Sequence, residues 1–523
     1  MELTANASLT HSSVCKTRQS GRYARRAAAA AIAAVSLLLL LLLASTQVSA
    51  QVGTADVLGT VTDQTGAVIV NAKVTVTNLG TGAAETKNTD AKGEYLFTTL
   101  PNGNYSVSVE MQGFKKFTRN FALSTGERVR IEAAMVTGEV SENVVVNSSE
   151  AAMLQTDSST VSSTVEPKAV QDLPMANRNF YTVLQLQPGV SAGAEFGATG
   201  GQGTANSGST LYDRRPFSTI VANGQSSGAN DNLVNGFDNN EVAWGNTSVR
   251  PTVDGIAELK MESTNAPAEF GRAAGAVINV VTKSGSNQLH GSLFEFFRNQ
   301  NTDAQNYFNT EINAQGQQVS LPMAPYHQNN FGGSVGGPIK KDKTFFFFGI
   351  EDDRINEGQT FTVNVPDNYD YTNIQAGVGD FSDLCQYNIG CADPVLPADS
   401  PLILPIIMKM YQLYPKENHG EAAGVGSYVS SPPTVSRLLD WELRIDDQIS
   451  PNDKLFGRYA DNPTSMVYPG YLPSVNGVSP VGNSFGEVGT GQTNTKNMQL
   501  DYVHTFSTNV LLDAKAGYTR YDT

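Results

Sequence analysis

The strict alternation of side chains in residues 439–446 is the feature that most constrains the fold. Its apolar and charged residues occupy opposite faces: Trp441, Leu443 and Ile445 on one, and Asp440, Glu442, Arg444 and Asp446 on the other. A period of two is that of a β-strand, whereas helical side chains repeat every 3.6 residues. The segment therefore predicts a strand whose apolar face meets lipid and whose charged face lines a wet lumen.

Similar strand patterns recur along the second half of the chain. The expected strands are residues 289–299, 328–339, 343–355, 439–446, 454–460, 496–506 and 510–521. The turns at 340–342, 450–453 and 507–509 are short and the other connections are long, as in transmembrane β-barrels, whose short turns face the periplasm.

The odd number of these strands bears on the completeness of the barrel. Single-chain bacterial barrels have an even number, and an unclosed barrel leaves unpaired backbone groups in hydrocarbon. We expect residues 287–523 to be the first strands of an incomplete transmembrane β-barrel. The chain would then be an N-terminal fragment of a protein about twice as long, or a truncated gene product.

The N-terminus has the pattern of a secretory signal. Basic residues between Lys16 and Arg26 precede an apolar run at 27–44, and small residues follow at 48–50. This order predicts a signal peptide at residues 1–50, cleaved between Ala50 and Gln51. A retained signal anchor is the alternative, because the apolar run approaches the length of a membrane span.

Charge and cysteine content narrow the function classes. The chain has 523 residues, a formal net charge of -15 and 3 Cys. An acidic chain without a basic patch is not expected to bind nucleic acid. After loss of Cys15 with the signal peptide, Cys385 and Cys391 remain, and an oxidising compartment favours a local disulfide between them. A metal site and a pair of free thiols are the alternatives.

Residues 51–137 alternate apolar and polar positions in short runs separated by turn residues, which predicts a small β-sandwich. The stretch 90–105, DAKGEYLFTTLPNGNY, resembles the carboxypeptidase regulatory-like domain, an Ig-like/prealbumin-like β-sandwich. Gly93 and Gly103 suit hairpin positions that need positive φ. The resemblance implies a noncatalytic module. A zinc peptidase is rejected, because no His after residue 50 has a Glu three positions later.

Residues 165–286 resemble the plug domain of TonB-dependent outer-membrane receptors. They contain a short helix pattern at 167–172, an apolar stretch at 179–186, a Phe-Gly-Arg turn at 270–272 and the strand sequence GAVINVVTKSG at 275–285. The resemblance implies an α+β plug ahead of the barrel. Asn235, Asp238 and Asp254 are acids and amides that would suit a substrate path, but the sequence assigns no substrate-binding residue.

A linker at residues 138–164 carries a candidate contact for TonB. The run Glu142, Asn143, Val144, Val145, Val146 and Asn147 resembles a TonB box, with Asn147-Ser148 in place of the usual Thr-Ala. A short extended segment of this kind suits β-augmentation, in which it joins a partner's sheet. The last strand of the sandwich and a plain linker are the alternatives.

Together these segments describe a mainly β protein that resembles Oar-like TonB-dependent receptors. The resemblance implies energised uptake of an unidentified ligand, which is a glycan, peptide, metal chelate or protein. It also implies TonB of the TonB-ExbB-ExbD system and outer-membrane lipids as partners. The location would be the outer membrane of a Gram-negative-type bacterium, with the sandwich and the TonB contact in the periplasm.

Two other function classes were weighed. A surface adhesion or structural protein that transports nothing is the alternative to a receptor. A hydrolase is disfavoured, because the G-x-S-x-G matches at 224–228 and 332–336 lack the strand-turn-helix context of a nucleophile elbow. Asp231, Asp238 and Glu241 do not have the spacing of a calcium loop. We expect no enzyme activity, no cofactor and no metal.

Overall fold

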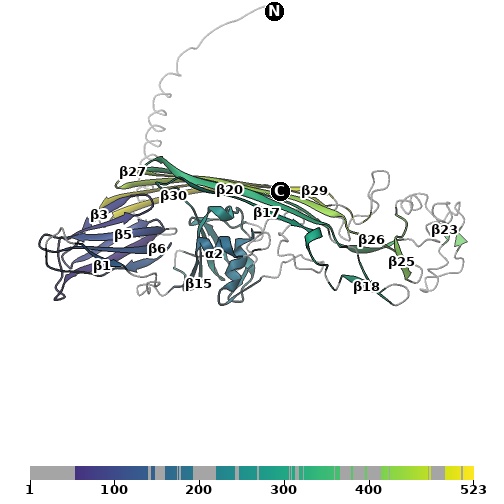
Figure 1. Cartoon of the computed structure of the whole chain (residues 1–523), viewed down its shortest axis with the longest axis horizontal. Helices are drawn as coiled ribbons and strands as arrows, with labels where there is room; N and C mark the ends of the chain where they lie inside the picture. Colours follow the sequence, from purple (N-terminus) through teal and green to yellow (C-terminus); the bar gives the residue numbers. More distant parts are fainter. Residues whose placement is uncertain are drawn as a thin grey trace, which may run out of the picture. The chain divides into compact units, whose positions relative to one another are not determined.

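The computed structural model is mainly β, as predicted from the sequence. It describes residues 54–522 with gaps, the larger of which are 139–142, 148–159, 193–219, 242–246, 366–378, 381–394, 397–413 and 473–488. Among the described residues, no helix combines the length and apolarity needed to cross a membrane. Four sheets organise most of these residues: the two sheets of a sandwich, a plug sheet and a long antiparallel sheet (Figure 1).

The sandwich consists of two sheets packed face to face. One contains β1 (Ala55–Asp63), β4 (Glu94–Leu100), β7 (Arg128–Arg130) and β8 (Ala133–Met135). The other has the order β3 (Ala84–Asn88), β2 (Lys73–Asn78), β5 (Gly103–Glu110), β6 (Lys116–Leu123) and β9 (Asn143–Asn147). Alternate residues of β1, β2, β4, β5 and β6 point inward and form one apolar core with residues of β7 and β8. Gly93 adopts φ +72° in the turn before β4, as its hairpin position requires.

The plug segment is built on a sheet of order β10-β15-β16-β13-β14. Its elements are β10 (Val161–Val165), α2 (Pro167–Asp172), η2 (Phe180–Leu186), β13 (Asp231–Val234), β14 (Phe237–Asp238), β15 (Ile256–Thr264) and β16 (Val277–Thr282). Every residue of β16 is buried, which explains why four of its six residues are Val or Ile. Asn235 and Gly236 both have positive φ between β13 and β14, as a two-residue Asn-Gly hairpin turn demands.

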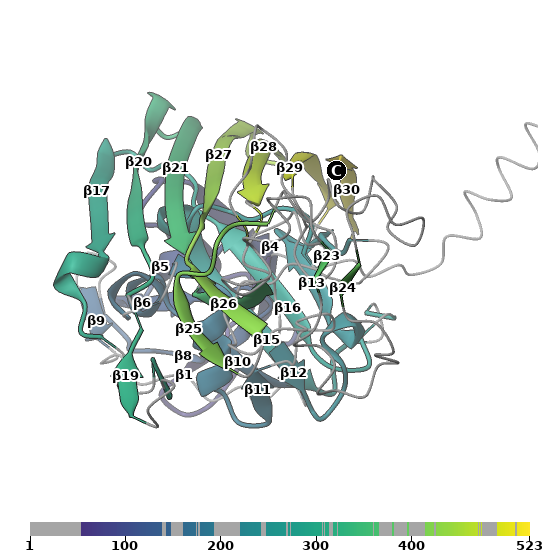
Figure 2. The same cartoon turned by 90° about the vertical axis from the view of Figure 1, so that its right-hand side faces the viewer.

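The long sheet contains seven strands in chain order, all antiparallel to their neighbours (Figure 2). They are β17 (His290–Asn299), β20 (Tyr326–Lys340), β21 (Thr344–Gly358), β27 (Pro433–Ser450), β28 (Asp453–Tyr468), β29 (Gly489–Ser507) and β30 (Val510–Asp522). Each of the seven strands expected from the sequence is present. Most are longer than expected, and β28 and β29 leave only residues 469–488 between them.

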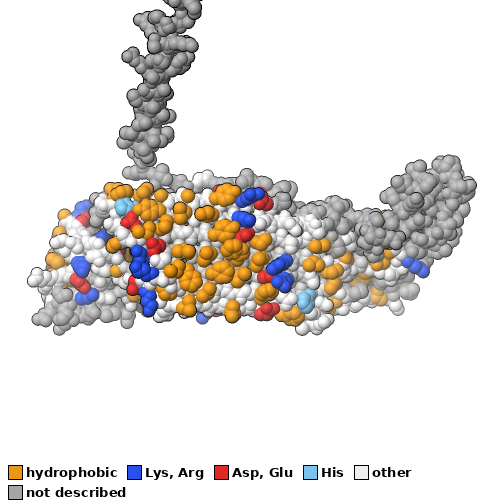
Figure 3. Space-filling model, turned by 90° about the horizontal axis from the view of Figure 1, so that it is seen from above, with side chains coloured by type: hydrophobic (Ala, Val, Ile, Leu, Met, Phe, Trp, Pro, Cys, Tyr) orange, Lys and Arg blue, Asp and Glu red, His pale blue; other side chains and the backbone are white. Residues whose placement is uncertain are grey.

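The register of this sheet separates an outer apolar face from an inner polar face. One outward row runs through Val335, Phe348, Leu443, Tyr459, Met498 and Tyr518. The inward row beside it includes Phe347, Arg444, Arg458 and Gln499. Figure 3 shows the outer face, where a band of hydrophobic side chains lies between two groups of charged side chains. The predicted alternation of residues 439–446 is therefore confirmed.

The connections on one end of the sheet are tight and those on the other end are long. Lys340 and Thr344 flank one tight turn, and Ser450 and Asp453 flank another. The long connections contain small sheets of their own: β18 (Thr310–Ile312) with β19 (Gln318–Ser320), and β22 (Phe361–Val365) with β25 (His419–Ala422) and β26 (Val425–Ser430). A further pair is β23 (Gly379–Asp380) with β24 (Val395–Leu396).

The sandwich core offers a matched test of which face each strand buries. On β4, Phe97 is 0% exposed and its neighbour Leu96 is 41% exposed. We expect Phe97→Ala to lower the free energy of unfolding of the sandwich by about 3–5 kcal/mol, and Leu96→Ala by less than about 1 kcal/mol. Urea unfolding of the intact protein, monitored by the protease sensitivity of residues 54–138, measures both losses of stability. Equal losses of stability in the two variants would show that Phe97 does not lie on the core face of β4.

Candidate functional site

Five of the residues predicted to carry a role lie outside the described residues. These are the cleavage pair Ala50 and Gln51, the thiols Cys385 and Cys391, and Glu142 at the start of the TonB-contact candidate. The other five residues of that candidate, Asn143–Asn147, form strand β9. It pairs in parallel with β6, so this segment is both the TonB-contact candidate and the edge strand of the sandwich sheet.

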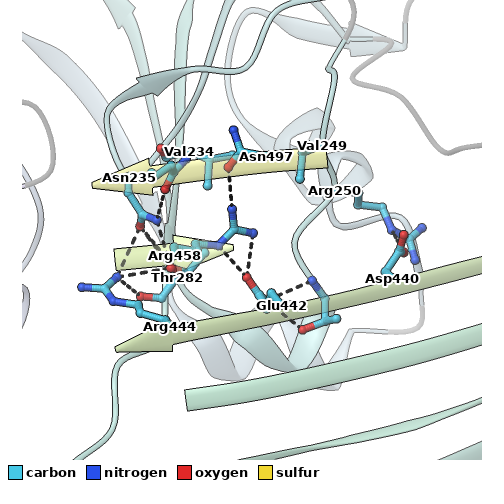
Figure 4. A network of polar contacts seen from close by, with 12 residues as sticks. Val234, Asn235, Val249, Arg250, Thr282, Asp440, Glu442, Arg444, Arg458 and Asn497 are labelled. Carbon is cyan, nitrogen blue, oxygen red and sulfur yellow. Dashed lines mark hydrogen bonds and ion pairs between the residues drawn. The ribbon is translucent and has the colours of Figure 1, made fainter. Parts of the chain in front are cut away.

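Buried polar and charged side chains of the plug and of the long sheet meet at the inner face of that sheet. We call this set of contacts the plug–sheet interface. It brings together plug residues Arg178, Asn235, Arg250, Thr252 and Thr282 and sheet residues Glu351, Asp440, Glu442, Arg444, Arg458, Asn462 and Gln499. All are buried or nearly so, and Figure 4 shows much of the network.

Arg250 is the more deeply buried of the two plug arginines in the interface. Its Nε donates to Asp440 Oδ2 at 2.8 Å, and its Nη2 lies 3.5 Å from Glu351 Oε1. The backbone of Arg250 is held as well, because its N–H donates to Asn462 Oδ1 and its carbonyl accepts from Asn462 Nδ2. The neighbouring carboxylates raise the pKa of Arg250 against the effect of burial, so the side chain stays charged.

A second group of contacts is centred on Glu442 of β27. Thr252 of the plug donates its hydroxyl to Glu442 Oε1 at 3.0 Å. The other carboxylate oxygen accepts from Arg458 Nε at 2.8 Å, and Arg458 in turn donates to Asn497 Oδ1. Arg458 is 2% exposed, so Glu442 neutralises a cation that water does not reach.

A third group joins the end of β16 to the sheet. Arg444 Nη1 donates to the carbonyl oxygen of Thr282 at 2.9 Å and pairs with Asp446 at 2.7 Å. Asn235 Nδ2 donates to Thr282 Oγ1 and to Gln499 Oε1, both at 3.0 Å. The Asn-Gly turn between β13 and β14 thus supplies a side chain that reaches from the plug to β29.

Arg178 forms the contact of the plug with β17 and β21. Its Nε lies 3.2 Å from Glu351 Oε1, and its guanidinium sits over the ring of Phe294 at 4.2 Å from the centroid. Arg178 has φ +48°, a conformation that L-residues with side chains rarely adopt. Asp254, a predicted path residue, lies 3.5 Å from Arg178 Nη2 and accepts from Ser292.

These contacts define what the interface can do. It is a packed set of charge-assisted hydrogen bonds between a plug and a sheet, to which Phe237 of the plug adds an edge-to-face ring contact with Phe456 of β28. Such contacts are strong while water is excluded, but water can replace each of them if the plug moves. The arrangement therefore suits a plug that is held specifically and can still be displaced.

The plug also contacts the sandwich through one buried carboxylate. Glu258 of β15 is 4% exposed, and both of its oxygens accept from the Thr125 N–H, at 3.1 and 3.2 Å. Burial raises the pKa of Glu258 to about 7, despite the lowering effect of the Thr125 N–H and of Lys260. Thr125 lies in the turn that follows β6.

The residues weighed for metal binding and hydrolysis serve other contacts. Asp231 and Asp238 both accept from Asn240 Nδ2, at 2.8 and 2.7 Å. Within the described part of the chain, no group of three or more His, Cys, Asp and Glu side chains is placed to hold a metal ion. One G-x-S-x-G match lies within β20 and the other spans a turn and a short 3-10 helix.

Sequence reasoning found only one side of the interface. It placed Asp440, Glu442 and Arg444 on the lumen face of their strand, and the structure confirms this. It missed Arg178 and Arg250, which lie outside the regular strands of the plug and follow no periodic pattern. No local pattern in the sequence singles them out, because the plug segment is about as rich in basic residues as the rest of the chain.

Comparisons with known proteins bear on both halves of the chain. Residues 281–523 match the family model described as an outer membrane beta barrel domain, and residues 56–136 match the carboxypeptidase regulatory-like domain. The chain is 26% identical over 318 residues to the TonB-dependent transporter Oar of Myxococcus xanthus. It is a homologue of Oar. The match covers 59% of this chain and 27% of Oar, so the chain spans about a quarter of the length of that relative.

Solved structures of two receptors were also found. The ferric enterobactin receptor of Pseudomonas aeruginosa is 14% identical, with 69% of this chain and 40% of that chain covered and a TM-score of 0.37. The siderophore receptor PirA of Acinetobacter baumannii is 17% identical, with 68% and 47% covered and a TM-score of 0.31. The matched barrel domain and the relationship to Oar together support an outer-membrane location.

The Arg250 contacts are open to a direct test. Arg250→Met leaves Asp440 buried without its cation, so we expect the free energy of unfolding to fall by about 3–5 kcal/mol. The double variant Arg250→Met/Asp440→Leu should recover most of that loss. Arg130→Met, at an exposed ion pair with Glu132, should cost less than about 1 kcal/mol. Denaturant unfolding in detergent gives all three values, and similar losses for Arg250→Met and Arg130→Met would contradict the interface.

Glu258 predicts a pH dependence of stability. Its pKa is about 7 in the folded protein against a usual value of 4.5, so the folded state binds the proton more tightly. Stability should therefore fall as the pH rises from about 4.5 to 7, by about 3 kcal/mol in total. Glu258→Gln should remove this fall and be the more stable protein at pH 8. Urea unfolding at pH 5 and pH 8 measures it, with the exposed Glu94→Gln as control, and an unchanged pH profile in Glu258→Gln would refute the assignment.

Proposed function

We propose that this chain is part of a TonB-dependent outer-membrane receptor that takes up an unidentified ligand by displacing its plug. The observation that carries the proposal is the plug–sheet interface, in which buried Arg250, Glu442 and Arg444 hold a plug against the polar face of a membrane sheet. A plug held this way closes the lumen at rest and needs mechanical work to move. The relationship to a TonB-dependent transporter supports the same conclusion.

The proposed domain arrangement follows from the same observations. Residues 1–50 form the signal peptide, 51–137 the sandwich, 138–164 the linker with the TonB contact, 165–286 the plug and 287–523 the start of the barrel. Nothing in this arrangement calls for enzyme activity. The ligand class is open between a glycan, a peptide, a metal chelate and a protein.

The proposed orientation places the sandwich in the periplasm. Asn287, just before β17, donates to the carbonyl oxygen of Thr81 in the sandwich at 2.7 Å, and also to Asp342 in the tight turn between β20 and β21. The sandwich thus contacts the end of the sheet that carries tight turns. In outer-membrane barrels the tight turns are periplasmic, where TonB is found. TonB of the TonB-ExbB-ExbD system would bind at residues 142–147.

The second candidate is a surface adhesion or structural protein that keeps the sandwich and the barrel. The long connections around β22, β25 and β26 favour it, because long external loops can bind a surface as well as a ligand. The plug–sheet interface does not favour it, since a permanent plug needs no displaceable polar contacts.

Uptake in cells tests the proposal. Tracers of three chemistries are used: ferric citrate, a labelled maltodextrin and a labelled oligopeptide. We expect uptake of at least one tracer to be lost when the gene is deleted, when residues 142–147 are removed and when tonB is deleted, because each change removes the energy input. Removal of residues 151–156 is the matched control and should retain uptake.

The outcomes separate the candidates. Normal uptake of an otherwise gene-dependent tracer after removal of residues 142–147 would show that TonB does not act there. Uptake that depends on the gene and not on tonB would refute energised transport. Surface binding of cells that depends on the gene, with all tracer uptake unchanged by its deletion, would support the adhesion protein instead.

A further inference from the structure

The TonB-contact candidate is already extended and paired. β9 runs parallel to β6 through five register pairs, from Lys116 opposite Asn143 to Asn120 opposite Asn147. The sheet order β3-β2-β5-β6-β9 places it at the edge. The two interpretations of this segment, a strand of the sandwich and a contact for TonB, are therefore compatible.

The outer edge of β9 is where a partner can add. Among the described strands, β6 is the only one that pairs with β9. An edge strand presents half of its backbone N–H and C=O groups on its unpaired side. A second strand can bind these groups without breaking any hydrogen bond between β9 and β6. Because the sandwich has already ordered β9, the incoming strand does not bear the entropy cost of ordering it.

The sandwich is also connected to the plug. β6 leads directly into the turn that contains Thr125, whose N–H is bound by Glu258 of β15. Further along the chain, β10 pairs antiparallel with the same β15, from Val161 to Val165. A force applied to β9 is thus transmitted to β15 by two routes, through the sandwich and along the chain. A partner bound at the sandwich edge can therefore still act on the plug.

We propose that the sandwich presents β9 to TonB as a preformed edge strand, and that TonB adds a strand of its own to the outer edge of β9 while β9 stays paired with β6. This inference rests on the TonB contact proposed above. It gives the sandwich a role in receptor function: it is the template that keeps the contact segment extended.

A disulfide between β6 and β9 tests whether the two strands stay together. Thr118 and Val145 are register partners, so Thr118→Cys/Val145→Cys is made in the intact protein with its native cysteines replaced by Ser. The probe is the purified periplasmic domain of TonB from the same bacterium. We expect its Kd to agree within twofold between the oxidised and reduced protein. Loss of binding on oxidation, restored by reductant, would show that TonB takes β9 away from β6 and would overturn the proposal.

Removal of the sandwich should change the affinity for TonB in opposite directions for two mechanisms. In one, TonB binds β9 while β9 is paired with β6, and in the other it binds β9 after β9 has left β6. Without residues 54–137, β9 loses its template, and we expect TonB binding to weaken at least tenfold. Equal or tighter binding would overturn the proposal, since a segment freed from β6 would then be the better partner. Resistance of the barrel to SDS at room temperature shows that each variant has folded.

A third variant separates failure of this inference from failure of the proposed TonB contact. If removal of residues 142–147 leaves TonB binding unchanged, the contact itself is misplaced and both statements fall. If that removal abolishes binding but the oxidised disulfide does so too, the contact stands and only the presentation by β6 is refuted.

Discussion

Buried charges between a plug and the inner face of a membrane sheet are the interactions on which this structure depends. Lipid requires an apolar outer face, and the period of two then places the other half of each strand inside. Those inner side chains are polar and, once covered, each needs a partner, because an unpaired buried charge is very costly. Arg250 and Arg178 supply cations to Glu351, and Asp440 accepts from Arg250 as well.

The chemistry of these contacts decides how the plug is held. An apolar plug would be held in the lumen only by the burial of apolar surface. The cost of exposing that surface to water would oppose every step of its release. Charge-assisted hydrogen bonds behave differently, because water can replace them one by one as the contact opens. The plug–sheet interface is thus specific in its register through pairs such as Asn235 with Gln499, and it is still compatible with displacement.

The sandwich and the plug are joined by much less. One carboxylate, Glu258, binds the turn after β6, and its raised pKa makes this contact sensitive to pH near neutrality. The strand that leaves the sandwich, β9, and the strand that enters the plug, β10, are consecutive in the chain. The carboxypeptidase regulatory-like domain is therefore connected to the plug both by the Glu258 contact and along the chain.

The sequence alone determined the features that depend on local periodicity and turn chemistry. The alternation in residues 439–446, the strand sequence at 275–285 and the short runs separated by turn residues at 51–137 are local patterns, so the strands, their faces and the sandwich were predicted correctly. Strand lengths were underestimated, because the strands extend past the apolar band, where the pattern ends. Only the tertiary structure decided which charges meet. Arg250 and Asp440 lie 190 residues apart in the sequence. Their pairing is set by how the plug packs against the sheet. The pairing of β9 with β6 likewise could not be predicted from local sequence, because backbone hydrogen bonds between strands do not depend on which side chains the strands carry.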